Sequence, residues 1–462
     1  MTLSTPQQLV EQGLEASKAD GTVIVVTPST SANLRWANNT LTTNGVMHDC
    51  QVSVIATVDG GQGAAAGSVI ASAAGIEQVL DLVEAAESAA RSSGAAEDAA
   101  PLVDGDADRD WGDAPASTSI EVFDRFAPAL GEAFGRARDQ QRILYGYVEH
   151  TVSTTYLGSS TGLRRRHVQP TGHVGITGKN SALTSSAWVG GATRDFTDVD
   201  PLALDAELAK RLGWADRTVA LDAGRYDTVL PPTAVADLLI YAYWTAGARD
   251  AFEGQTVFSR PGGGTRIGER LSEQPVTVFS DPAYPGLECS PFVTAAMSSS
   301  DSSVFDNGLP VTRTAWIDQG SLAALAQTRH SAAVTDLPIT PRIDNLVMDT
   351  GSGHGTLDEM VRGVDRGLLL TCLWYIREVD PQTLLLTGLT RDGVYLVEGG
   401  EVTGAVNNFR FNESPVDLLG RFSAATVTQA SFSREWGDYF PRTATPALRV
   451  PDFNMSSVSQ AQ

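Results

Sequence analysis

The chain has 462 residues, a formal net charge of −22 and a hydrophobic content of 42%. A chain of this length exceeds one ordinary hydrophobic core, so we expect two or three domains. The strongly negative charge favours solubility and disfavours nucleic acids or anionic membranes as partners. The first residues lack the basic and apolar regions of a signal peptide, and no apolar run reaches the ~20 residues that cross a bilayer.

The cysteines point to a reducing compartment. Cys50, Cys289 and Cys372 are odd in number, far apart in the sequence and form no CxxC motif. This pattern favours free thiols over a disulfide framework. We therefore expect a cytoplasmic protein.

Residues 1–93 predict an N-terminal α/β module. Thr5 and Pro6 have the residue types of a helix cap and a first helical position. Residues 23–26 form an apolar run typical of a buried strand, and residues 50–58 alternate as in a half-buried strand. Residues 94–116 follow with many Ala, Asp, Gly and Pro residues and almost no apolar period, which predicts an acidic linker or mobile loop.

Residues 117–222 predict a middle module made of a helix and a hairpin. The apolar period indicates a helix at residues 122–134, and alternation predicts hairpin strands at residues 145–156 and 163–169. The hairpin carries Arg164-Arg165-Arg166, which we interpret as a solvated charge run rather than a nucleic-acid patch, because the whole chain is acidic. His173 follows on the hairpin, where a surface or turn role is favoured over metal binding.

Residues 223–462 predict a C-terminal domain dominated by antiparallel β-sheet. It begins with a helix that starts at Pro231-Pro232-Thr233 and runs through Trp244. Thr356 and Glu359 have the spacing of a capping box, and we expect the helix that follows to end at Gly367. Residues 368–374 are apolar enough for a strand buried on both faces. The fold class predicted for the whole chain is α+β.

Several segments of the sequence resemble the TldD/PmbA family, which is also called TldD/TldE. The C-terminal resemblance lies in PRIDN at residues 341–345, TLDEM at 356–360, GLLLT at 367–371, VDPQT at 379–383 and YLVEGGEV at 395–402. LRWANN at residues 34–39 and TTNG at 42–45 resemble the N-terminal domain of the same family. The family is associated with cytosolic bacterial metallopeptidases that form heterodimers, so the resemblance implies a role in proteolysis.

The resemblance also identifies positions where an active member would bind zinc. Active members carry a helical HExxxH motif, in which two histidines bind zinc and the glutamate acts on bound water, and a cysteine ligand near the C-terminus. The register from residues 229–232 places Ile240, Tyr241 and Thr245 at the motif positions, and none of them replaces its counterpart. The region matching the cysteine ligand, residues 433–437, contains no cysteine. We therefore expect neither catalytic residues nor a cofactor in this chain.

Four other residues are candidates for contact with a peptide. Arg342 and Asn345 precede the glycine loop, and an arginine there could bind a peptide carboxylate through its forked guanidinium. The alternative is that both residues fix the loop to its own domain. His330 follows Arg329 at the end of a strand-like run, and His354 lies in the glycine loop. For both histidines a cleft role is weighed against that of a solvated loop residue.

These observations predict a PmbA/TldE-like, metal-free subunit of a TldD/TldE-type peptidase that acts on unfolded peptides. The expected partner is a TldD-like homologue that carries the zinc, or a second copy of this chain. Two alternatives stay open at this point. The chain could be a stand-alone peptidase with an unrecognised site, or a non-catalytic homo-oligomer that binds peptides.

Overall fold

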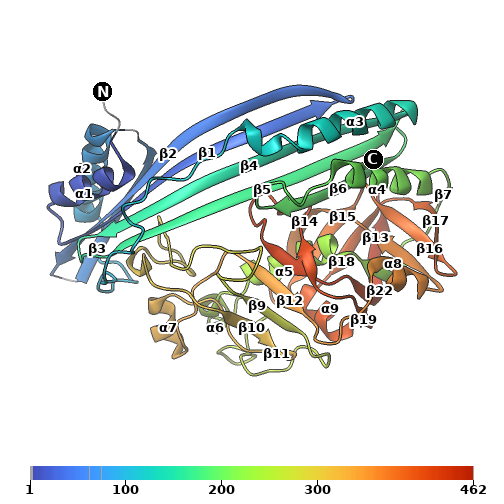
Figure 1. Cartoon of the computed structure of the whole chain (residues 1–462). Helices are drawn as coiled ribbons and strands as arrows, with labels where there is room; N and C mark the ends of the chain where they lie inside the picture. Colours follow the sequence, from blue (N-terminus) through green and yellow to red (C-terminus); the bar gives the residue numbers. More distant parts are fainter. Residues whose placement is uncertain (1–3, 62, 74, 461–462) are drawn as a thin grey trace.

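The computed structural model describes residues 4–61, 63–73 and 75–460 and confirms the predicted α+β class. A long N-terminal sheet lies across a C-terminal half that contains two further sheets (Figure 1). Among the described residues, no helix has the length and apolarity needed to cross a membrane. The chain is thus arranged in two large parts.

The N-terminal sheet is antiparallel throughout and has the order β3-β2-β1-β4-β5-β6. Its strands come from both sides of the segment 94–116, so residues 1–93 and 117–222 share one sheet. The strands extend well beyond the short runs predicted from the sequence, because β1 and β4 stay paired over most of their lengths. Their bounds are β1 Gly21–Ala37, β2 Thr40–Gly60, β3 Gly63–Ser72, β4 Arg142–Ser159, β5 Arg164–Asn180 and β6 Ser186–Thr193.

The two faces of this sheet pack against different partners. Helices α1 (Pro6–Ala16) and α2 (Ile76–Ser92) cover one end of the outer face, where Ile24 and Val26 of β1 meet them. Helices α3 (Phe126–Asp139) and α4 (Pro201–Trp214) cover the other end, over Trp36 (Figure 1). The alternate residues Val23 and Val25 face the C-terminal half, where they pack with Phe305. Because side chains alternate along β1, one face of this strand packs on the helices and the other packs on the C-terminal half.

The C-terminal half is built on two sheets. The larger has the order β14-β15-β18-β22-β8-β13-β16-β17-β7, with β19 paired to β22, and the smaller has the order β11-β10-β9-β12-β21-β20. Strand bounds in chain order are β7 Thr218–Val219, β8 Gly224–Leu230, β9 Thr277–Ser280, β10 Thr314–Asp318, β11 Ser321–Leu322, β12 Leu346–Asp349, β13 Arg366–Leu370, β14 Leu373–Asp380, β15 Leu385–Thr390, β16 Val394–Glu398, β17 Glu401–Val406, β18 Phe409–Glu413, β19 Ala424–Ala425, β20 Gln429–Ser431, β21 Thr443–Thr445 and β22 Leu448–Val458.

Helix α5 (Pro232–Trp244) lies in the core of this half and contacts both sheets through β8, β20 and β21. It is the helix predicted from the proline pair, and most of its residues are buried. A helix that is apolar on nearly all sides is stable only inside a core. The shorter helical elements are η1 Ile120–Phe123, α6 Ala248–Phe252, η2 Val304–Asp306, α7 Arg329–Thr335, α8 Leu357–Arg362 and α9 Pro415–Arg421.

Two predicted boundaries in this half were wrong. The capping box of Thr356 and Glu359 is present, but α8 ends at Arg362 rather than at Gly367. Gly367 belongs to β13, where a Cβ atom would lie 2.4 Å from the backbone oxygen of Asp227, so the glycine permits close strand packing. The strand predicted at residues 368–374 is broken after Leu370, because Thr371 turns to donate its N–H to the Gly393 oxygen (2.8 Å).

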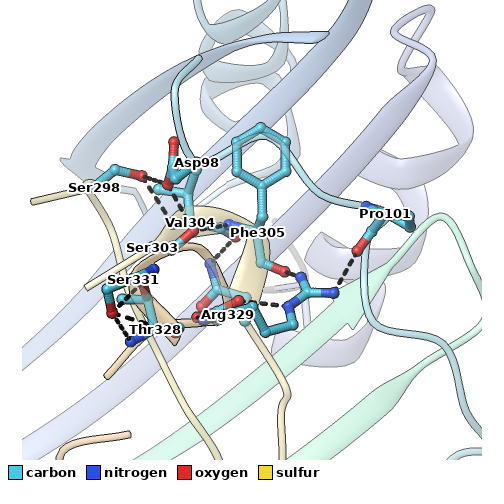
Figure 2. A network of polar contacts seen from close by, with 11 residues as sticks. Asp98, Pro101, Ser298, Ser303, Val304, Phe305, Thr328, Arg329 and Ser331 are labelled. Carbon is cyan, nitrogen blue, oxygen red and sulfur yellow. Dashed lines mark hydrogen bonds and ion pairs between the residues drawn. The ribbon is translucent and has the colours of Figure 1, made fainter. Parts of the chain in front are cut away.

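Residues 94–116 connect the two parts of the protein along an extended, hydrogen-bonded path. Figure 2 shows Arg329 of α7 donating to the backbone oxygen of Pro101 (3.0 Å) and to Phe305. In the same network, the Asp98 carboxylate accepts hydrogen bonds from Ser298 and Ser303, each at 2.6 Å. The segment is therefore fastened to the C-terminal half by both its backbone and its carboxylates.

The same segment also pairs with the arginine run of the hairpin. Arg165 lies 2.8 Å from Asp108, and Arg166 lies 2.9 Å from Asp110. The interpretation of a solvated run was wrong for Arg166, whose side chain is only 9% exposed. The acidic segment supplies the negative charges that allow these arginines to lie against the protein surface.

Candidate functional site

The positions expected to correspond to the zinc motif lie in and directly after α5. Ile240 is fully buried in the core, and the ring of Tyr241 lies 5.8 Å from that of Trp436. Thr245 follows the helix, where its hydroxyl donates to the backbone oxygens of Tyr241 (3.3 Å) and Ala242 (3.1 Å). The three side chains thus take part in packing and in ending the helix.

The segment expected to match the family's cysteine ligand packs directly on α5. Ser433 donates its hydroxyl to Asp237 Oδ1, and the backbone N–H of Glu435 donates to the same oxygen (3.0 Å). The indole N–H of Trp436 donates to the backbone oxygen of Asp237 (3.0 Å). The two regions that the resemblance placed in one site are therefore neighbours in space.

Asp237 is the buried ionisable group at this junction. Its side chain is completely buried, and its Oδ2 has no hydrogen-bond partner among the described residues. Loss of hydration raises the pKa of Asp237 to about 7, which the hydrogen bond from Ser433 partly opposes. In the sequence, Asp237 is a carboxylate inside an otherwise apolar helical run. This signal could have identified the residue, but it was not among the predicted site residues.

The residues at this junction do not fit a zinc ion. Isoleucine has no donor atom, burial raises the pKa of the Tyr241 phenol, and the Thr245 hydroxyl already bonds to the helix. Nearby, Cys372 is fully buried, and loss of hydration raises the pKa of its thiol to about 12, which opposes the thiolate form. Within the described part of the chain, no group of three or more His, Cys, Asp or Glu residues is placed to hold a metal ion.

Two adjoining cavities lie where the inner face of the N-terminal sheet meets the segment that follows β20. They have volumes of about 370 and 480 Å³ and share Tyr147, His173, Gly437 and Asp438 in their walls. The smaller of the two has the size of an ordinary small-ligand site. Both cavities lie at the boundary between the two parts of the protein.

Aromatic rings form one wall of the smaller cavity. His173 of β5 stacks on Phe432 with ring centres 5.8 Å apart, and Trp188 of β6 stacks on the same ring at 6.4 Å. Burial lowers the pKa of His173, which favours the neutral imidazole. The expected surface or turn role of His173 was therefore wrong, because the C-terminal segment covers its strand.

Arg342 and Asn345 form contacts within the C-terminal half. Arg342 donates to the last backbone oxygens of α5, those of Tyr243 (2.6 Å) and Trp244 (2.9 Å), and pairs with Asp301 (2.5 Å). Asn345 is fully buried and donates to the Asp281 (2.6 Å) and Leu287 (2.7 Å) oxygens. These contacts are of the kind expected if the two residues fix the loop, which was the alternative to a peptide contact.

The two candidate histidines lie in other places. His330 belongs to α7, not to the strand-like run expected from the sequence, because Thr328 caps a helix by accepting the N–H of Ser331 (3.0 Å). Its Nε2 lies 3.6 Å from Glu97. His354 is in the glycine loop, with its Nδ1 3.1 Å from the Ser352 oxygen. The structure does not bring the four candidates together in one cavity.

The α+β fold of the chain is shared with solved structures. TldE from Thermococcus kodakarensis superposes with a TM-score of 0.75 at 16% identity, covering 97% of this chain and 99% of that one. A proposed modulator of DNA gyrase from Thermotoga maritima gives 0.75 at 16% identity, with coverages of 97% and 100%. A protein with a similar description from Bacteroides thetaiotaomicron gives 0.76 at 14% identity, with 98% of each chain covered.

The sequence itself matches the family model described as the PmbA/TldA metallopeptidase C-terminal domain over residues 223–457. This match covers more than half of the chain, and the chain belongs to the TldD/PmbA family. No curated protein matches the sequence. At the identities given above, the solved structures establish a shared fold, and the family match agrees with the resemblance recognised in the C-terminal segments.

Proposed function

We propose that this chain is a PmbA/TldE-like, metal-free subunit of a TldD/TldE-type peptidase in the cytoplasm. In this proposal a TldD-like homologue supplies the zinc and the catalytic residues, and this chain forms part of the wall of the chamber that receives unfolded peptides. The chain then needs no cofactor of its own. The complex would contain one chain of each kind.

The junction of α5 with the Ser433 segment carries this proposal. The two elements that would supply zinc ligands in an active member are in contact in this chain, which supports the assignment of the motif positions. The side chains found there are Ile240, Tyr241 and Thr245, and they serve packing and helix termination. Side chains of this kind at the expected motif positions support a subunit that acts through a partner.

This chain would contribute by holding the peptide in position. Sheet edges offer free main-chain N–H and C=O groups, which bind an extended peptide without regard to its sequence. The two cavities beside Gly437 would add room for side chains along the same boundary. Such an arrangement suits a peptidase that acts on unfolded segments.

Subunit mixing tests the proposal. A TldD-like homologue is held at constant concentration, this chain is added, and hydrolysis of an unfolded peptide is measured. The rate is expected to rise and to saturate at equal amounts of the two chains. Replacing the motif glutamate of the homologue should abolish the activity, whereas Tyr241→Phe in this chain should leave it unchanged. Hydrolysis that requires Tyr241, or that appears without the homologue, would support a stand-alone peptidase instead.

A further inference from the structure

The smaller cavity at the domain boundary contains an arginine in an unusual environment. Arg434 lies in its wall, and its guanidinium carbon is 3.8 Å from the ring centre of Trp374 and 4.9 Å from that of Trp188. Contacts of this kind orient the guanidinium plane through cation–π attraction. The direction of the cation is therefore fixed before any ligand arrives.

Arg434 forms no direct ion pair within the described part of the chain. Its Nε–H is buried and donates to no acceptor among the described residues. The carboxylates of Asp392, Asp237 and Glu435 stabilise its charge from a distance, and those of Asp392 and Glu435 lie beside Arg391 and Arg377 instead. Loss of hydration lowers the pKa of the Arg434 side chain, although an arginine keeps its proton in proteins. A partly buried guanidinium with an unpaired N–H is costly, so this position favours the entry of an anion.

A second cation and two glycines complete the cavity. Arg35 of β1 also lines the cavity and is exposed, and among the described residues its side chain forms no ion pair. Gly175 leaves open space beside Trp188, since a Cβ atom at that position would be 3.5 Å from the indole nitrogen. Gly437 is required for the shape, because a Cβ atom there would lie 2.3 Å from the ring of Phe432.

We propose that this cavity binds the C-terminal carboxylate of a peptide, with Arg434 as the fixed partner of the carboxylate and Arg35 as a second, exposed cation. The forked guanidinium matches the two carboxylate oxygens. The rings of His173, Phe432 and Trp188 would pack against the last side chain of the peptide. This inference rests on the proposed role in holding peptides. It adds that the chain recognises the C-terminal end of the peptide.

The surroundings favour one carboxylate over a more highly charged ligand. Asp438 lies in the wall of both cavities and Glu149 in that of the larger one, so additional negative charge would be repelled. The net charge of −22 adds to this repulsion at longer range. A single carboxylate at the end of an apolar or aromatic residue matches both the cations and the ring-lined wall.

Binding of two matched probes to the isolated chain tests the inference. The probes are N-acetyl-Gly-Phe with a free carboxylate and the same compound as its C-terminal amide, measured by calorimetry and by tryptophan fluorescence. We expect the acid to bind about tenfold or more tightly than the amide, since a charge-assisted pair is lost in the amide. Equal binding of the two probes, or binding of inorganic phosphate as tightly as the acid, would overturn the assignment.

Variants locate the site on the chain. Arg434→Gln should remove the preference for the acid. Gly175→Val should prevent both probes from binding, although Arg434 is still present in this variant. The matched control is Arg313→Gln, which removes a guanidinium lying 4.3 Å over the ring of Phe279, away from the cavity. Thermal unfolding establishes that each variant is folded. An unchanged preference for the acid in folded Arg434→Gln would contradict the proposal.

These measurements need neither a partner nor zinc. If the probes do not bind while subunit mixing restores hydrolysis, the carboxylate site is wrong and the proposed function stands. If the acid binds through Arg434 while mixing has no effect, the site stands and the subunit role is wrong.

Discussion

Ser433 and Asp237 are 196 positions apart in the sequence, yet the hydroxyl of one donates to the buried carboxylate of the other. The same hydroxyl accepts the backbone N–H of Trp436 (2.8 Å). One serine thus connects α5 to the segment that forms the wall of the candidate site. Both residues are fully buried, which closes this pair to substrate and indicates a structural role.

Ser433→Ala should destabilise the protein. The substitution removes the hydrogen bond to Asp237 and leaves the Trp436 N–H without its acceptor, so we expect a loss of about 1–3 kcal/mol in the free energy of unfolding. Chemical denaturation measures the change. Ser457→Ala on the exposed part of β22 is the control and should lie within about 0.5 kcal/mol of wild type. Equal stability of the two variants would show that the Ser433 hydroxyl does not stabilise the contact between α5 and this segment.

Asp237→Asn should change how stability depends on pH. The pKa of Asp237 in the folded protein, about 7, is above the ordinary value of 3.8, so the folded state holds the extra proton between these values. The free energy of unfolding of wild type therefore contains a contribution that falls as the pH rises through this window and levels off above it. The asparagine variant has no such titration.

The measurement is urea unfolding of both proteins at pH 5 and pH 8. The free energy of unfolding of the variant minus that of wild type should increase by roughly 1–3 kcal/mol from pH 5 to pH 8. Taking the difference between the two proteins removes the titration of other groups that they share. A difference that is constant with pH, or that changes in the opposite direction, would show that Asp237 ionises normally in the folded state.

Arg329→Ala should loosen the segment that joins the two parts of the protein. The variant loses the bond to Pro101 and leaves the buried carboxylate of Asp306 without its cation, which lies 2.6 Å away in the wild type. We expect destabilisation of about 3–5 kcal/mol. Amide hydrogen exchange should become faster around Pro101 before it does so in the sheet core.

A surface ion pair provides the control for Arg329. Arg260 and Glu269 are 3.3 Å apart and largely accessible to solvent, so Arg260→Ala should change stability by at most about 1 kcal/mol. It should also leave exchange near Pro101 at the wild-type rate. If exchange in the segment responds equally to both variants, the contact with Arg329 is not what fastens it.

The sequence was most informative where local signals are strong. Prolines at the start of α5 and the capping box of Thr356 and Glu359 predicted two helices whose first residues are correct. The end of the second helix was misjudged because Gly367 serves strand packing, a tertiary contact that leaves no local pattern. Recognition of the family likewise depended on short segments, most of them in the C-terminal half, where the family match is found.

Contacts between distant segments account for what sequence reasoning did not predict. The pairing of Arg166 with Asp110 and that of Ser433 with Asp237 join segments with no common periodicity. Arg434 shows the same limitation, because its environment comes from Trp188 and Trp374 on different strands. Side-chain type alone does not distinguish such a position from an ordinary surface arginine.

The most direct test of the central claim is the zinc content and peptide hydrolysis of the isolated chain, purified under native conditions. The account predicts zinc far below one ion per chain and no hydrolysis until a TldD-like homologue is added, with both chains then eluting together. One zinc per isolated chain, accompanied by hydrolysis that a chelator stops, would contradict it.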